Sequence, residues 1–148
     1  MKIRLLPLTT ALLITLSIPT FAGEQTDSAT WQQLDPAWTQ TSEQIIEFVG
    51  EDKQKLLAQL AYASVAAKTC QGLTLDQNKF QQTFDANFNE KSLGKTVKAA
   101  EMMAYGQKVA MYFGVYIGLL TADSMMERDT FCNAAQQMKT NGETHYWL

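Results

Sequence analysis

Apolar side chains recur along this chain at three- and four-residue steps, the spacing of one face of an α-helix. The pattern is clearest between Glu51 and Cys70, where one helical face would carry Leu56, Leu60, Ala63 and Ala67. Four further segments show helical spacing, and none has the alternation of apolar and polar residues typical of a strand. The pattern therefore predicts an all-α fold, an irregular bundle of about five helices.

Local signals predict where the helices begin and end. Asp35 and Pro36 have the residue types of an N-cap and a first helical position, and Gly50 has that of a C-cap. The corresponding signals elsewhere are Gly72 at the end of the second helix, Asp76 at the start of the third, Asp129 or Thr130 at the start of the fifth, and Asn141-Gly142 at its end.

Three phenylalanines, Phe80, Phe84 and Phe88, stand at four-residue steps on one face of the expected third helix. Rings placed in this way usually belong to the core, and a ligand-binding aromatic box is the alternative. Because no convergent polar groups accompany the rings, we favour the core.

The fourth segment is helical from Lys95 to about Ala122, and Val109 to Leu120 carries twelve uncharged residues in succession. A helix that is apolar all round is expected to be buried on most sides. Twelve residues also fall short of the roughly 20 that span a membrane. The charged stretch Asp123 to Asp129 should end this helix.

Small residues form a ridge on this helix at every fourth position: Gly106, Ala110, Gly114, Gly118 and Ala122. Such a ridge lets another backbone approach closely, either within the monomer, which we favour, or at a subunit or partner interface. Gly106, Ala110, Gly114 and Gly118 are therefore candidate interface residues. Tyr146 and Trp147 join them, because an aromatic C-terminus should dock either onto the bundle or onto something else.

The N-terminus has the order of a secretory signal peptide. Lys2 and Arg4 precede an apolar stretch from Leu5 to Ile18, Pro19 breaks it, and Thr20-Phe21-Ala22 offers a cleavage site. We expect a signal peptide over 1–22, a polar leader over 23–34 and a single helical domain over 35–148. The protein would then be periplasmic or secreted.

Loss of the signal peptide removes two of the 12 basic residues and leaves 10 against 15 acidic ones, a net charge of −5. An acidic chain is a poor ligand for nucleic acid or anionic headgroups, and we expect no stable membrane insertion. In an oxidising compartment, Cys70 and Cys132 are expected to form one structural disulfide. Two free, buried thiols are the alternative.

Residues that carry chemistry are sparse. His145 is the single histidine, and it lies three residues from the end. The sequence contains no cluster with metal-ligand spacing and no glycine-rich phosphate loop. The acidic pairs are better explained as helix starts or solvated faces. We therefore expect no catalytic residues, no metal site and no cofactor, and a protein that is not an enzyme.

The signal peptide, the helices, the disulfide and the segment Tyr116-Ile117-Gly118 together resemble small helical periplasmic immunity proteins. Those proteins block toxic amidases delivered by type VI secretion. The resemblance implies a binding protein that acts by protein–protein interaction, and it assigns no role to single residues. A periplasmic chaperone or stress protein is the alternative, and a small secreted enzyme or effector is a second one. A protein partner is expected, and a homodimer is possible.

Overall fold

The computed structural model describes residues 29–89, 98–143 and 145–148, without the side chains of 29–32. The expected signal peptide and residues 23–28 of the expected leader lie outside this range. The fold is all-α, as predicted, and five helices lie in the described residues. They are α1 (Ala29–Val49), α2 (Glu51–Thr69), α3 (Gln77–Phe88), α4 (Ala99–Met126) and α5 (Arg128–Thr140).

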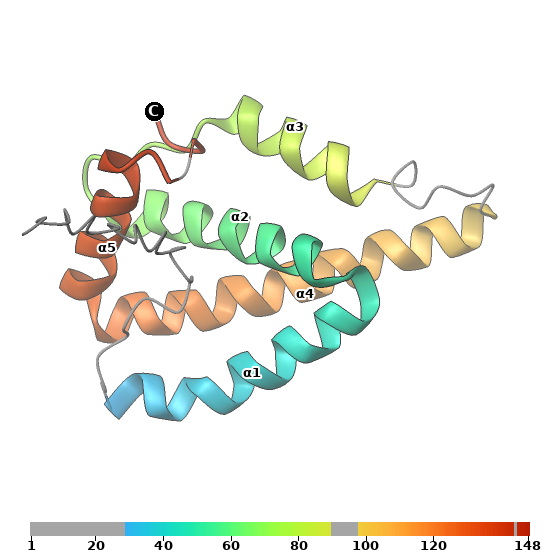
Figure 1. The fold of residues 1–148 in the computed structure, drawn as a ribbon, viewed down its shortest axis with the longest axis horizontal. Helices are drawn as coiled ribbons and strands as arrows, with labels where there is room; N and C mark the ends of the chain where they lie inside the picture. The colour runs from blue at the N-terminus through green and yellow to red at the C-terminus, as the bar shows by residue number, and fades with distance from the viewer. Residues whose placement is uncertain (1–28, 90–97, 144) are drawn as a thin grey trace, which may run out of the picture.

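The helices form an irregular bundle in which α1, α2 and α4 pack against one another (Figure 1). Helix α3 runs beside α2, and α5 closes one end of the bundle. The N-terminal end of α4 extends beyond the other helices at the opposite end. Among the described residues, α4 packs against α1, α2 and α5.

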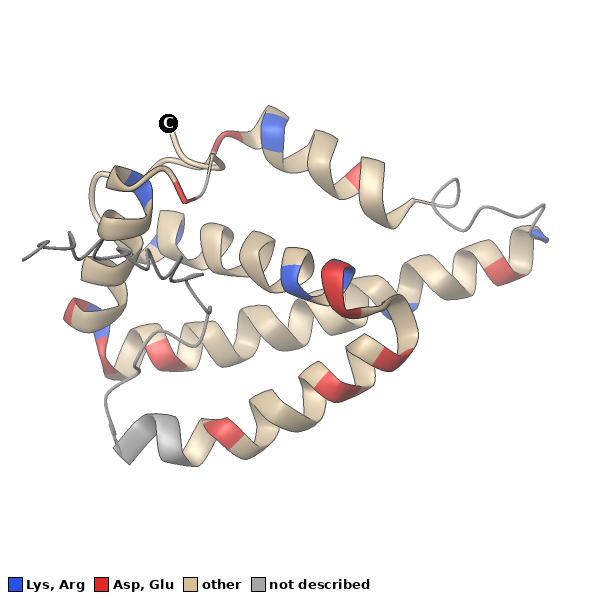
Figure 2. Ribbon diagram, in the orientation of Figure 1, with Lys and Arg blue, Asp and Glu red and all other residues tan. Residues whose placement is uncertain are grey.

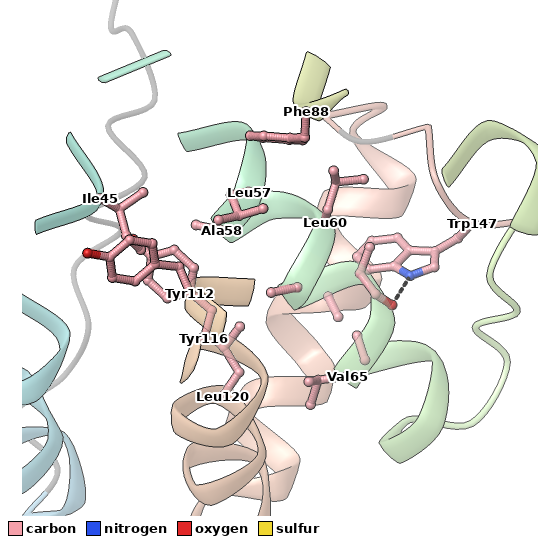
Figure 3. Close-up of a cluster of buried hydrophobic side chains, with 14 of the residues drawn as sticks. Ile45, Leu57, Ala58, Leu60, Val65, Phe88, Tyr112, Tyr116, Leu120 and Trp147 are labelled. Atoms are coloured by element: carbon pink, nitrogen blue, oxygen red, sulfur yellow. Dashed lines mark hydrogen bonds between the residues drawn. The ribbon is translucent and has the colours of Figure 1, made fainter. Parts of the chain in front are cut away.

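The core lies between α2 and α4, and α1 covers one side of it. Figure 3 shows Leu57 and Leu60 of α2 beside Tyr112 and Tyr116 of α4. Leu57, Leu60 and Tyr116 have no exposed surface. Each large side chain buried in this way contributes about 1.5–3 kcal/mol, so these contacts hold α4 by one face.

A buried polar group joins the three central helices. Gln54 Nε2 of α2 donates a 2.6 Å hydrogen bond to the hydroxyl of Tyr116 on α4, and Ser42 Oγ of α1 lies 3.0 Å from the same hydroxyl. The Trp38 ring of α1 packs on the Tyr116 ring, with the centroids 4.8 Å apart. Buried polar groups are costly without hydrogen-bond partners. The three side chains can satisfy one another only when the helices are aligned in this way, so they fix the alignment of α1, α2 and α4.

Most of the predicted helix ends are confirmed. Gly50, Gly72 and Gly142 have φ values of 87°, 75° and 68°, a backbone region that favours glycine and ends a helix. Asp76 caps α3, because its carboxylate accepts a 3.1 Å hydrogen bond from the Lys79 N–H.

The predicted start of α1 is wrong. Helix α1 begins at Ala29, so residues 29–34 of the expected leader are helical, and Pro36 lies inside the helix. Proline removes one backbone hydrogen bond from a helix interior. Pro36 is exposed, so water can solvate the carbonyl that loses its donor.

The predicted break between Asp123 and Asp129 is present, but it is shorter and begins later than expected. Helix α4 continues to Met126, and α5 begins at Arg128 after a turn at Glu127. Asp123 and Ser124 lie in the last turns of α4 and are buried, with 8% and 1% of their surface exposed. Ser124 Oγ donates a 2.9 Å hydrogen bond to the Thr121 carbonyl. Polar residues that look like a break therefore belong to the packed end of the helix.

Candidate functional site

Helix α4 has one face that packs against the bundle. Its buried residues recur at three- and four-residue steps: Tyr105, Val109, Tyr112, Tyr116, Leu120, Asp123 and Ser124. The rings of Tyr105 and Tyr112 contact Phe48 of α1, with centroids 5.3 Å and 5.9 Å away. We call this the inner face of α4.

The opposite side of α4 is apolar and exposed. Met103 is 66% exposed, Met111 55%, Val115 39% and Met125 78%. Between them lie small residues and two exposed polar ones. This outer face of α4 comprises Met103, Gly106, Gln107, Ala110, Met111, Gly114, Val115, Gly118, Thr121 and Met125.

The small-residue ridge lies on the outer face. Gly106, Ala110, Gly114 and Gly118 are exposed, and Ala122 is half-buried. A Cβ atom added at Gly106, Gly114 or Gly118 would meet nothing within 4 Å. The expectation that the ridge packs tightly inside the monomer is therefore wrong, and so is the expectation that α4 is buried on most sides. The inner face therefore supplies most of the buried residues that hold this glycine-containing helix.

Charged groups are absent from the outer face. Lys108 lies beside it, but its Nζ sits 4.2 Å from the centre of the Phe48 ring, in a cation–π contact with α1. Figure 2 shows the middle of α4 as a stretch without acidic or basic residues. The outer face can therefore be covered without taking a charge out of water.

The C-terminal tail docks onto the bundle. Trp147 is 7% exposed, and its Nε1 donates a 3.0 Å hydrogen bond to the Ala63 carbonyl of α2 (Figure 3). The backbone N–H groups of Leu148 and Asp76 donate to the carbonyls of Thr74 and Tyr146, at 2.8 Å and 2.7 Å. Of the two predicted alternatives for the tail, the structure shows docking onto the bundle.

The candidate interface residues therefore fall into two separate groups. Tyr146 is half-buried and Trp147 is in the core. Both lie on the α2 side of the bundle, whereas the ridge on α4 faces away from α2. The structure does not bring the tail and the ridge together, and of the two groups the ridge is the exposed one.

The predicted disulfide is present. Cys70 and Cys132 are bonded, with their Cα atoms 5.3 Å apart. The bond ties the C-terminal end of α2 to the first turn of α5. Arg128 and Gln136 of α5 reinforce it by donating to the carbonyls of Thr69 and Gln71, at 2.7 Å and 2.9 Å. These contacts fix the corner where α4 meets α5.

Titratable groups with shifted pKa values lie at this corner. Burial raises the pKa of the Asp123 carboxyl, and the nearby Glu127 raises it further. Burial also raises the pKa of Tyr62, and the charge of Asp123 adds to this effect. Tyr62 donates a 3.1 Å hydrogen bond to the Phe131 carbonyl, which gives its hydroxyl a structural role.

The aromatic residues of α3 pack against the core. Phe88 is buried, and Phe80 and Phe84 are half-buried against Phe113 of α4, with ring centroids 6.1 Å and 5.7 Å away.

The single histidine, His145, is exposed. No group of three or more histidine, cysteine, aspartate or glutamate residues in the described part of the chain could hold a metal ion.

By length and composition, α4 could cross a membrane, which corrects the expectation that this apolar segment falls short of membrane length. The core helix of a soluble protein passes the same test.

Comparisons with protein-family models, curated proteins and solved structures give no match for this chain. The function must therefore be argued from the geometry.

Sequence reasoning singled out the small residues of the outer face but missed its large ones. Met103, Met111, Val115 and Met125 were not among the candidates. A signal for the two end methionines was present, because each lies 11 residues from Gly114 (114 − 103 and 125 − 114). Eleven residues make about three helical turns, so such residues share a face.

Proposed function

We propose that this chain is an exported helical binding protein, which docks another protein on the outer face of α4. The exposed, uncharged outer face supports this proposal most directly. Exposed apolar surface that is continuous along a helix is typical of interaction sites, whereas single exposed apolar side chains are common everywhere. Met103, Met111 and Met125 supply large, adaptable side chains at both ends and in the middle of this surface.

Among binding roles, we favour an inhibitor or immunity protein against a cell-envelope toxin, such as a type VI secretion amidase. Such a role needs a rigid surface that covers the toxin and no chemistry of its own. The inner face holds α4 against α1 and α2, and the Cys70–Cys132 bond fixes the corner at its C-terminal end. A partner would therefore meet a surface that is already ordered, which lowers the entropic cost of binding.

Capture from a periplasmic extract by the mature protein tests the proposal. We expect the wild type and Met126→Glu to retain the same partner and Gly118→Glu to lose it. Both variants add one negative charge to an exposed position of α4, and Gly118 alone belongs to the outer face. The purified partner should bind at a fixed ratio and lose its activity when bound. Turnover of a substrate by this protein, with no partner that depends on Gly118, would contradict the proposal.

A chaperone is the second candidate, and the exposed methionines favour it. Met103, Met111, Met125 and Met126 are all more than half exposed, and flexible methionine-rich surfaces suit varied clients. If this role is correct, the protein should suppress aggregation of reduced lysozyme, and Gly118→Glu should weaken the suppression. Unchanged aggregation with a tenfold excess of the protein would exclude it.

A further inference from the structure

Seven residues along the midline of the outer face are arranged almost symmetrically about Gly114: Met103, Gln107, Ala110, Gly114, Gly118, Thr121 and Met125. Met103 lies 11 residues before Gly114 and Met125 lies 11 residues after it (114 − 103 = 125 − 114 = 11). Both methionines are among the most exposed apolar residues of the protein, at 66% and 78%. The midline thus has a small centre and a large, adaptable side chain at each end, and Met111 and Val115 flank the centre on one side.

The positions between the centre and the ends repeat this symmetry in residue type. Ala110 and Gly118 lie four residues to either side of Gly114 and are both small. Gln107 and Thr121 lie seven residues to either side, and both are exposed and polar. The order along the midline is therefore nearly the same in the two chain directions: large, polar, small, small, small, polar, large. The other three residues of the outer face, Gly106, Met111 and Val115, do not follow this symmetry, because the positions that mirror them are half-buried.

We propose that a second copy of this chain covers the outer face, with the two α4 helices antiparallel about a two-fold axis through Gly114. In such a pair, each position meets the position equally far from Gly114 on the other copy. Met103 then packs on Met125, Ala110 on Gly118, and Gln107 lies opposite Thr121. A two-fold interface must be complementary to itself, and the symmetry about Gly114 meets that requirement. This inference rests on the proposed function, because it names an occupant for the same surface.

Charge also favours a second copy over a charged partner. The chain has a net charge of −3, so a basic protein would be attracted to its acidic groups. The outer face contains no acidic group, and Val109 to Leu120 contains no aspartate, glutamate, lysine or arginine (Figure 2). Interface centres are depleted in charged residues. Two acidic copies can therefore meet here without burying a charge, and added salt should screen their remaining repulsion.

The size of the face predicts a weak dimer. Met103 to Met125 spans 22 residues (125 − 103), which is about 33 Å at ~1.5 Å per residue, and a helix is about 10 Å wide. The footprint of two such faces is then roughly 700 Å², below the ~1,200 Å² of stable interfaces. Three small residues at the centre, Ala110, Gly114 and Gly118, let the helices approach to the short end of the usual ~8–10 Å spacing.

Sedimentation of the mature protein between about 1 µM and about 1 mM covers the range in which weak interfaces dissociate. We expect the average mass to rise toward twice the monomer mass and the rise to strengthen with salt. Gly114→Leu should remain a monomer throughout. The variant should still fold, because nothing lies within 4 Å of a Cβ atom at Gly114 and leucine is a better helix former than glycine.

Two neighbouring methionines provide a matched control. Met125 and Met126 are both exposed, at 78% and 59%, and only Met125 lies on the outer face. Met125→Gln should weaken the dimer several-fold, whereas Met126→Gln should leave it unchanged. Equal effects of the two substitutions would place the contact elsewhere and overturn the proposal.

Variants with one free thiol determine the relative orientation of the two α4 helices. Both native cysteines are bonded to each other, so Met103→Cys or Met125→Cys introduces the sole thiol. A mixture of the two variants should cross-link as a mixed dimer under mild oxidation, and each variant alone should cross-link poorly. Efficient cross-linking of each variant with itself would indicate parallel helices and overturn the antiparallel arrangement.

The remaining outcomes separate this inference from the proposed function. A protein that stays monomeric at 1 mM but binds a partner through Gly118 overturns the dimer alone. A dimer that needs Gly114 but captures no partner supports the inference and leaves the proposed function without support. A monomer that sediments with neutral phosphatidylcholine vesicles, and is released from them by Gly118→Glu, would identify a lipid surface as the occupant and overturn both.

Discussion

Both faces of α4 carry apolar residues, but only the inner face is buried in the bundle. The inner face presents tyrosines with a defined shape, and Trp38 and Phe48 of α1 pack on their rings. The outer face presents glycine, alanine and methionine, and it is exposed among the residues that the structure describes. Hydrophobicity alone therefore does not determine which face of a helix is buried. Large rings that find aromatic partners on α1 distinguish the inner face here.

The comparison also shows why α4 can keep glycines. A glycine in a helix interior costs up to about 1 kcal/mol relative to alanine. The inner face carries several large buried side chains, each of which contributes about 1.5–3 kcal/mol. The inner face can therefore offset the cost of Gly106, Gly114 and Gly118, and the outer face is free to serve another purpose.

The largest expected effect comes from removing a ring on the inner face. Tyr116 is fully buried, and replacing a large aromatic side chain with alanine typically costs about 3–5 kcal/mol. Tyr116→Ala should lower the free energy of unfolding by that amount, as measured by urea denaturation. A loss below about 1 kcal/mol would mean that the inner face does not hold the helix.

The hydroxyl of Tyr116 should matter in its own right. Tyr116→Phe leaves Gln54 without the acceptor of its 2.6 Å hydrogen bond, and an unsatisfied buried group costs about 1–3 kcal/mol. Tyr105 provides the control, because its buried hydroxyl has no hydrogen-bond partner among the described residues. Tyr105→Phe should therefore leave stability unchanged or raise it. Equal losses in the two variants would show that the ring environment, and not the hydrogen bond, determines the effect.

The contribution of Asp123, at the C-terminal end of the inner face, to the stability of the fold should depend on pH. Burial, and then Glu127, raise the pKa of Asp123 above its unfolded value, so the folded state binds this proton more tightly than the unfolded state does. The contribution of Asp123 to stability is then greatest below its unfolded pKa. It declines as the pH rises from that value through the raised, folded pKa.

Asp123→Asn should remove this decline and stabilise the protein at neutral pH, by less than the loss expected for Tyr116→Phe. Urea denaturation at several pH values between about 3 and 7, around the usual range of carboxyl pKa values, measures the difference. If the free energy of unfolding of the variant depends on pH as that of the wild type does, the dependence comes from other carboxyl groups.

Local chemistry made much of the fold predictable from sequence. Gly50, Gly72 and Gly142 end helices because the chain needs positive φ there, and Asp76 supplies a cap. Two cysteines in a chain with an export signal made the bond between Cys70 and Cys132 a reasonable expectation, and the bond is present. Each of these signals depends on a few neighbouring residues and on little of the tertiary structure.

The orientation of α4 was predicted wrongly because both of its faces are apolar between Val109 and Leu120. A periodic pattern identifies a buried face only when the opposite face is polar. The spacing of Tyr105, Tyr112 and Tyr116 held the missing information, since these tyrosines share the inner face. The end of the helix was missed for a related reason: Asp123 and Ser124 look like a break in sequence and are buried in the structure.

The smallest expected effect tests the outer face in the monomer. Gly114→Ala adds a methyl group where nothing lies within 4 Å, and alanine is favoured over glycine in a helix by up to about 1 kcal/mol. At low concentration, the variant should gain stability by that amount, measured by urea denaturation. Ala110→Gly is the reverse substitution one turn away on the same exposed face, and it should lose a similar amount. A loss of stability in Gly114→Ala would mean that the outer face already has a packing partner at that concentration, because only a neighbouring backbone would make an added methyl group unfavourable there.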